Sequence, residues 1–126
     1  MPFLRYALPA VLLAGCINTI GNTQASPADK PGAYMVVMGK DYVPADLAPY
    51  QATLPPIYEK YGGRYVALST EPDFAEGRND YQAVVISAWP DAAAARRFWD
   101  SPEYRESVKL REGLGTFDVV IVPALP

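Results

Sequence analysis

The sequence predicts a single α+β domain, and three observations lead to this prediction. Short apolar runs typical of strands alternate with segments whose apolar residues recur at helical spacing. Half of the 126 residues are hydrophobic and a fifth are charged, which is the composition of a globular protein. After the leading segment described below, the chain has room for one domain of about 100 residues and not for a second.

Four strands are expected where β-branched and aromatic residues are concentrated, at residues 34–38, 64–68, 81–89 and 117–122. Between the first two strands, apolar residues follow the spacing of a helix: Leu47, Tyr50, Leu54, Ile57 and Tyr61. Pro55 and Pro56 lack amide hydrogens, so this helix is predicted to be kinked or split near Thr53. Gly62 and Gly63 should end it, and a helix C-cap explains this pair better than a phosphate-binding loop does.

A second helical region is expected between the last two strands. Asp91 precedes four alanines as a candidate N-cap, and Ser101 precedes Pro102 as another. We therefore predict two helical pieces, ended by Gly113 and Gly115. Ser101 is interpreted as a cap and not as a nucleophile, because the chain has no histidine to activate it.

The resulting order, βαββαβ, is that of the ferredoxin-like fold, a four-stranded antiparallel sheet with helices on one face. The strands at 64–68 and 81–89 should pair as a hairpin. Consecutive apolar residues, as in Val36-Val37 and Val119-Val120, make the strands apolar on both faces. Since the helices can cover only one face, a second copy of the chain is expected on the other, giving a homodimer through the sheet face.

Residues 1–15 are predicted to be a signal peptide, with one charge at Arg5 and an apolar stretch from Tyr6 to Leu13 that is too short to span a bilayer. Leu13-Ala14-Gly15-Cys16 resembles the bacterial lipobox, which implies lipidation of Cys16 and an anchor in a membrane facing the periplasm. The alternative is cleavage behind Ala25, which would give a soluble periplasmic protein. Residues 16–32 are expected to form a flexible tether, and residues 33–126 the folded domain.

The composition excludes several classes of function. The chain has no histidine and one cysteine, so it cannot build a Ser-His-Asp triad, a His-ligated haem or an ordinary His/Cys zinc site. We expect neither a metal nor a cofactor. The formal net charge of −3 provides no basic field for phosphates, which argues against a nucleic-acid partner.

Several motifs together resemble Domain of Unknown Function family 1330, of the dimeric α/β-barrel superfamily, from about Ala33 to Pro123. The matching motifs are Lys60-Tyr61-Gly62-Gly63-Arg64-Tyr65, Glu76-Gly77, Trp89-Pro90, Ser101-Pro102-Glu103-Tyr104 and Arg111. The resemblance implies a ferredoxin-like protomer in a face-to-face dimer, with no established reaction. The superfamily also holds haem enzymes, cofactor-free monooxygenases and isomerases, but a shared fold does not transfer an activity. The lipobox is a departure from the family.

Candidate ligand-binding residues are large aromatic or cationic side chains, each of which also has a structural interpretation. Arg111 is expected on one helical face with Tyr104 and Val108, where it could bind a carboxylate or an enolate or pair within the protein. The full candidate set is Arg64, Trp89, Trp99, Tyr104 and Arg111, with Tyr58 and Tyr65 as further members of an aromatic pocket.

Three functions follow as alternatives. The first is an envelope-tethered domain that binds a small organic ligand in a cleft between sheet and helices. The second is a cofactor-independent isomerase or monooxygenase in which Arg111 stabilises an enolate. The third is a structural dimer without a ligand.

Overall fold

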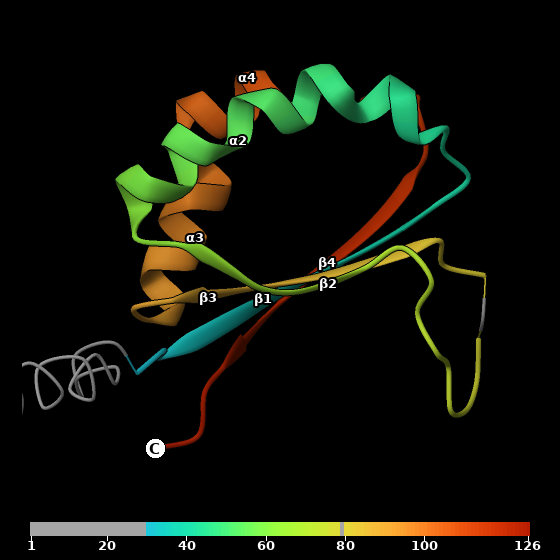
Figure 1. The fold of residues 1–126 in the computed structure, drawn as a ribbon. Helices are drawn as coiled ribbons and strands as arrows, with labels where there is room; N and C mark the ends of the chain where they lie inside the picture. Colours follow the sequence, from blue (N-terminus) through green and yellow to red (C-terminus); the bar gives the residue numbers. More distant parts are fainter. Residues whose placement is uncertain (1–29, 79) are drawn as a thin grey trace, which may run out of the picture. The chain divides into compact units, whose positions relative to one another are not determined.

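The computed structural model of the protein describes residues 30–78 and 80–126. The predicted signal peptide, Cys16 and most of the tether therefore lie outside the described residues. Within them the chain forms four strands, one 3-10 helix and three α-helices (Figure 1). In chain order these are β1 (Ala33–Lys40), η2 (Pro44–Leu47), α2 (Ala48–Tyr61), β2 (Arg64–Ser69), β3 (Ala83–Trp89), α3 (Ala92–Asp100), α4 (Pro102–Lys109) and β4 (Thr116–Pro123).

The four strands form one antiparallel sheet in the order β2-β3-β1-β4. This order and the helices gathered on one face of the sheet confirm the ferredoxin-like prediction (Figure 1). β2 and β3 pair as expected, with a bulge between Tyr65 and Ala67. β3 begins two residues later than predicted, at Ala83. Just before it, the amide of Gln82 donates to the carbonyl of Gly39 at 2.8 Å, and the Gln82 side chain bonds the main chain of Tyr42 in both directions, at 3.0 and 3.1 Å.

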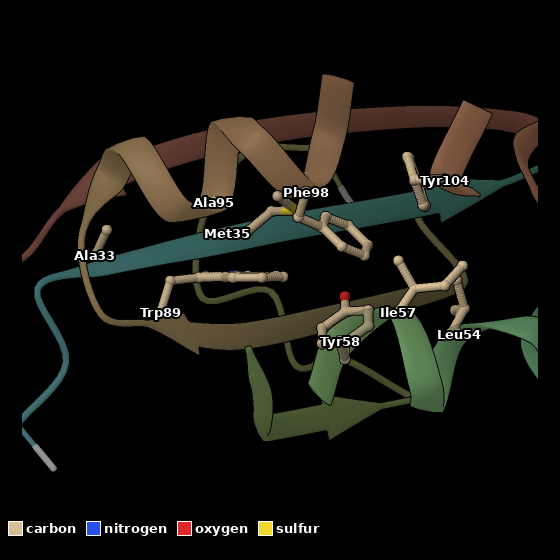
Figure 2. Close-up of a cluster of buried hydrophobic side chains, with 9 residues drawn as sticks. All are labelled: Ala33, Met35, Leu54, Ile57, Tyr58, Trp89, Ala95, Phe98 and Tyr104. Atoms are coloured by element: carbon tan, nitrogen blue, oxygen red, sulfur yellow. The ribbon is translucent and has the colours of Figure 1, made fainter. Parts of the chain in front are cut away.

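The core lies between the helices and the sheet and is built around aromatic rings packed at tilted angles (Figure 2). The ring centroids of Tyr58, Trp89 and Phe98 lie 4.7 to 5.1 Å from one another. Met35 of β1 packs into the same cluster, as alternation along a strand requires. Gly63 fits against Trp89 because it lacks a side chain: a Cβ there would lie 2.4 Å from the indole ring.

The helix was predicted to be kinked or split near Thr53, and a split is wrong, because α2 runs as one helix through Pro55 and Pro56. The two prolines leave the carbonyls of the preceding turn without their usual partners. The helix ends at Gly62 in a left-handed conformation, with φ 82°, as the sequence predicts. None of the helices in residues 30–78 and 80–126 is both long and apolar enough to cross a membrane.

The second helical region consists of two pieces, as predicted, and both predicted caps are present. The Asp91 carboxylate accepts a hydrogen bond from the amide of Ala94 at 2.6 Å, and Ser101 Oγ accepts one from the amide of Tyr104 at 3.1 Å. α4 ends at Lys109, one turn before Gly113 adopts a positive φ of 74°.

The sheet face opposite the helices carries a row of apolar residues. Val36 at the centre of β1 pairs with Ile86 on β3 and with Val120 on β4. Because side chains alternate along a strand, these three point away from Met35 and the core. Val120 is 45% exposed, and the helices of Figure 1 lie on the other side.

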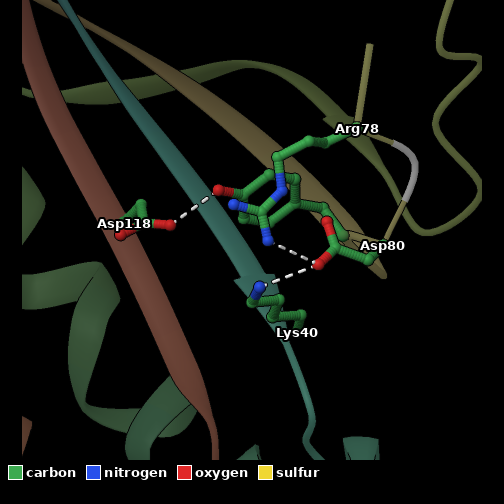
Figure 3. A network of polar contacts seen from close by, with 5 residues as sticks. Lys40, Arg78, Asp80 and Asp118 are labelled. Carbon is green, nitrogen blue, oxygen red and sulfur yellow. Dashed lines mark hydrogen bonds and ion pairs between the residues drawn. The ribbon is translucent and has the colours of Figure 1, made fainter.

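A polar network joins the loop between β2 and β3 to one end of the sheet (Figure 3). Asp80 accepts hydrogen bonds from Lys40 at 2.8 Å and Arg78 at 2.9 Å, and Tyr81 donates one to Asp118 at 2.7 Å. The hydrogen bonds from Lys40 and Arg78 lower the pKa of Asp80 to about 2. The network therefore anchors the loop to β1 and β4.

Candidate functional site

A pocket of about 350 Å³ lies between α2 and the sheet. This volume falls at the lower end of the range typical of small-molecule sites. The pocket is lined by side chains from α2 and from all four strands, among them Tyr50, Leu54, Tyr58, Val37, Leu68, Val85 and Phe117. The lining is mainly apolar, and its described residues include no carboxylate.

Arg111 is the one charged residue among the described residues that line this pocket. Its guanidinium lies between two rings, 4.4 Å from the centroid of Phe117 and 5.3 Å from that of Tyr50. Its Nε is buried and has no hydrogen-bond partner within the described part of the chain. A buried polar atom of this kind is uncommon in native proteins and calls for an explanation.

The position of Arg111 differs from the prediction in one respect. α4 ends at Lys109, and Arg111 follows in a turn in which its amide donates to the carbonyl of Val108 at 3.0 Å. Arg111 therefore lies just after the helix that carries Tyr104 and Val108 and not within it. The turn places the guanidinium against Tyr50 of α2 and Phe117 of β4.

Two tyrosine hydroxyls adjoin Arg111. Tyr50 of α2 and Tyr104 of α4 share a hydrogen bond of 2.9 Å between their hydroxyl oxygens. Burial raises the pKa of Tyr50 well above its usual value, and the Tyr104 hydroxyl adds to this increase. Burial likewise raises the pKa of Tyr58, whose ring also lines the pocket. At neutral pH the phenols of Tyr50 and Tyr58 are therefore uncharged hydrogen-bond donors and acceptors.

The guanidinium of Arg111 stays charged in this setting. Burial acts to lower its pKa, but the hydroxyls of Tyr104 and Tyr50 outweigh that effect, and the pKa is raised overall. No carboxylate forms an ion pair with Arg111 anywhere in residues 30–78 and 80–126. The site thus combines a cation, neutral phenols and apolar walls.

The other predicted site residues lie apart from the pocket. Trp89 is 1% exposed in the core, and its Nε1 donates to Ser87 Oγ at 2.9 Å, so its polar atom is satisfied internally. Trp99 packs beneath the guanidinium of Arg105, 4.8 Å from the ring centroid. Arg64 begins β2 opposite Ala88, on the exposed part of that strand.

Tyr104 does not line the pocket, but it is 3% exposed and its hydroxyl forms a hydrogen bond with that of Tyr50, which does. Tyr58 and Tyr65, the further aromatic candidates, do line it, with ring centroids 4.7 Å apart. Sequence reasoning missed Tyr50 and Phe117, which hold the guanidinium. Tyr50 had a detectable signal, because a phenol within an apolar helical stripe needs a polar partner.

A second hollow, of about 510 Å³, lies at the loop between β2 and β3. It is larger than the pocket beneath α2, but it is an open depression lined mainly by polar residues, including Glu71 and Asp73. In the described residues no group of three or more His, Cys, Asp or Glu side chains could hold a metal ion. The pocket with Arg111 is more enclosed and is therefore the better candidate site.

Solved structures with the same fold come from several bacteria. A protein of unknown function from Rhodopseudomonas palustris is 20% identical, with a TM-score of 0.61, and the alignment covers 90% of this chain and 94% of that one. A dimeric ferredoxin-like protein of unknown function from Thermobifida fusca is 14% identical, with a TM-score of 0.54 and coverage of 75% and 92%. SnoaB, a cofactor-independent oxygenase from Streptomyces nogalater, is 19% identical, with a TM-score of 0.51 and coverage of 75% and 92%. At these identities the similarity establishes the fold alone.

A search of curated proteins gives no match. The family described as "Domain of unknown function (DUF1330)" matches residues 32–125, which is most of the chain. This match agrees with the resemblance seen in the sequence motifs, and the strand order of the structure is consistent with it. The chain therefore belongs to the DUF1330 family.

Proposed function

We propose that this protein binds a small organic molecule in the pocket beneath α2, and that the ligand has an apolar body and one acidic oxygen group. The observation that carries the proposal is the Arg111 guanidinium, which has a buried Nε without a partner and no carboxylate among the described lining residues. Withdrawing a charge from water is unfavourable unless an opposite charge or hydrogen bonds compensate for it. A ligand carboxylate, phenolate or enolate would supply that partner, and the planar guanidinium suits a carboxylate.

The test is a ligand-dependent thermal shift with benzoate as the probe. Benzoate should raise the melting temperature of the wild type by several degrees at concentrations well above Kd, because a ligand that binds only the folded state stabilises it. Arg111→Met should lose this shift. Arg105→Met is the matched control, since it also removes an arginine from a ring face but lies outside the pocket lining. Absence of any shift in the wild type with benzoate and with larger carboxylates would contradict the proposal.

The geometry favours binding over proton transfer. A cation beside the Tyr50 and Tyr104 hydroxyls could hold an enolate oxygen, as a cofactor-independent isomerase or monooxygenase would require. Such a reaction also needs a base, however, and the raised pKa values of Tyr50 and Tyr58 disfavour ionised tyrosine at neutral pH. The described residues that line the pocket include no carboxylate that could act as the base in place of a tyrosine.

We propose that the protein acts as a homodimer through the sheet face that carries Val36, Ile86 and Val120. The apolar character of this face supports the proposal, because a contiguous apolar patch on a monomer favours association. The Thermobifida fusca protein of the same fold is itself described as dimeric.

We also propose that Cys16 carries a lipid that holds the domain at a membrane facing the periplasm. The lipobox-like Leu13-Ala14-Gly15-Cys16 supports this location, and residues 17–32 would serve as the tether. Mass spectrometry of membrane-extracted protein should show a diacylated amino terminus at Cys16, and Cys16→Ser should abolish it. A mature soluble chain beginning at Ser26 would contradict lipidation.

A further inference from the structure

We infer that the ligand of this pocket is a single-chain amphiphile such as an alkyl carboxylate, with its acid group at Arg111 and its chain running across the sheet to the free edge of β2. This inference rests on the proposed function and adds the shape and orientation of the ligand. It follows from the course of the pocket across the strands.

The pocket crosses the whole width of the sheet. Its lining includes Phe117 on β4, Val37 on β1, Val85 on β3 and Leu68 on β2, which follow the spatial order of the strands. Leu68 pairs with Val85, and Val85 pairs with Val37, so these three form one row. Three strand spacings amount to about 14 Å. The pocket is therefore an elongated slot and suits an extended molecule better than a round one.

The two ends of the slot differ in chemistry. At the β4 end, Arg111 packs on the Phe117 ring and its Nε is buried. At the β2 end, Leu68 is 64% exposed and Tyr65 is 47% exposed, although both residues belong to the lining of the pocket. A partly buried cation at one end and exposed apolar side chains at the other match a ligand whose acid group enters first.

The opposite orientation leaves both ends unsatisfied. A chain inserted first would bring methylene groups against the guanidinium and place the acid group over Leu68. That arrangement desolvates Arg111 further without giving it a partner, which is unfavourable. A compact aromatic acid would reach Arg111 but would leave Leu68 in water. The alkyl carboxylate covers Leu68 and neutralises Arg111 together.

The experiment measures Kd of the full chain for straight-chain carboxylates from butanoate to dodecanoate, each kept below its micelle concentration. We expect Kd to fall up to about fourfold with each added methylene, since each is transferred from water to an apolar slot, and then to level off once the chain passes the β2 edge. Methyl esters of the same acids should bind much more weakly. Arg111→Met should weaken every acid, whereas Leu68→Asp should weaken the long ones and spare butanoate.

Leu125→Asp is the matched control, because Leu125 is exposed and lies outside the pocket. Benzoate binding that depends on Arg111, with no gain from chain length or no effect of Leu68→Asp, would overturn the amphiphile and leave the proposed function standing. Failure of benzoate and of every alkyl carboxylate to bind would overturn both. Equal binding of octyltrimethylammonium would show that the chain adsorbs without recognition of the acid and would overturn the orientation.

Discussion

At the scale of single residues, the site is made by polar atoms placed among apolar ones. The Tyr50 and Tyr104 hydroxyls satisfy each other at 2.9 Å, while the Nε of Arg111 beside them has no partner among the described residues. A hydrogen-bonded phenol contributes to stability, whereas a buried polar atom without a partner does not. The fold therefore accounts for the two tyrosines, and the ligand that we propose would supply the missing partner of Arg111 Nε.

Ionisation of the buried tyrosines should destabilise the protein at alkaline pH. Burial raises the folded-state pKa values of Tyr50 and Tyr58 above the unfolded value of about 10. Their contribution to stability is thus complete below pH 10 and is lost as the pH rises above it. Denaturant unfolding from pH 8 to 11.5 should show the free energy of unfolding falling above pH 10, and less steeply in Tyr58→Phe. An unchanged slope in Tyr58→Phe would mean that this phenol does not contribute to the loss.

At the scale of elements, local chemistry made the helix ends predictable. Asp91, Ser101 and Gly62 each cap a helix as their residue types and neighbours indicate. α2 was harder, because its passage through Pro55 and Pro56 depends on tertiary contacts. Leu54, Ile57 and neighbouring residues bury one side of that helix in the core, which outweighs the local preference of two prolines to interrupt it.

Ser101 should contribute more to stability than an ordinary cap. It ends α3 and begins α4: its hydroxyl donates to the carbonyl of Phe98 at 2.7 Å and accepts from the amide of Tyr104. Ser101→Ala removes both bonds from a residue that is 4% exposed, so we expect a loss of about 1–2 kcal/mol, seen in thermal or denaturant unfolding. Ser69→Ala, which frees only an exposed amide, should change stability by less than about 0.5 kcal/mol. Equal losses in the two variants would show that the double cap has no special weight.

At the scale of the whole molecule, the sequence predicted the fold better than the site. Local sequence patterns predict the order of strands and helices, and the ferredoxin-like sheet follows from that order. The pocket arises where α2 crosses strands that are distant in sequence, so Phe117 and Leu68 carried no local sign of their role. Trp89 was a misleading candidate, because the sequence does not distinguish an aromatic residue with a polar atom in the core from one in a binding site.

The assembly of the molecule can be tested on the sheet face opposite the helices. Ile86 pairs with Val36 there, and both are only partly covered in the protomer, so a lysine at 86 could reach water in a monomer. In a face-to-face dimer the same lysine would be withdrawn from water against the apolar sheet of the partner, which is strongly unfavourable. The segment 31–126 should therefore sediment as a dimer at micromolar concentration, and Ile86→Lys should convert it to a folded monomer. Ala93→Lys adds the same charge on the exposed side of α3 and should leave the dimer intact. A wild-type monomer, or a dimer that persists in Ile86→Lys, would show that the sheet faces do not meet.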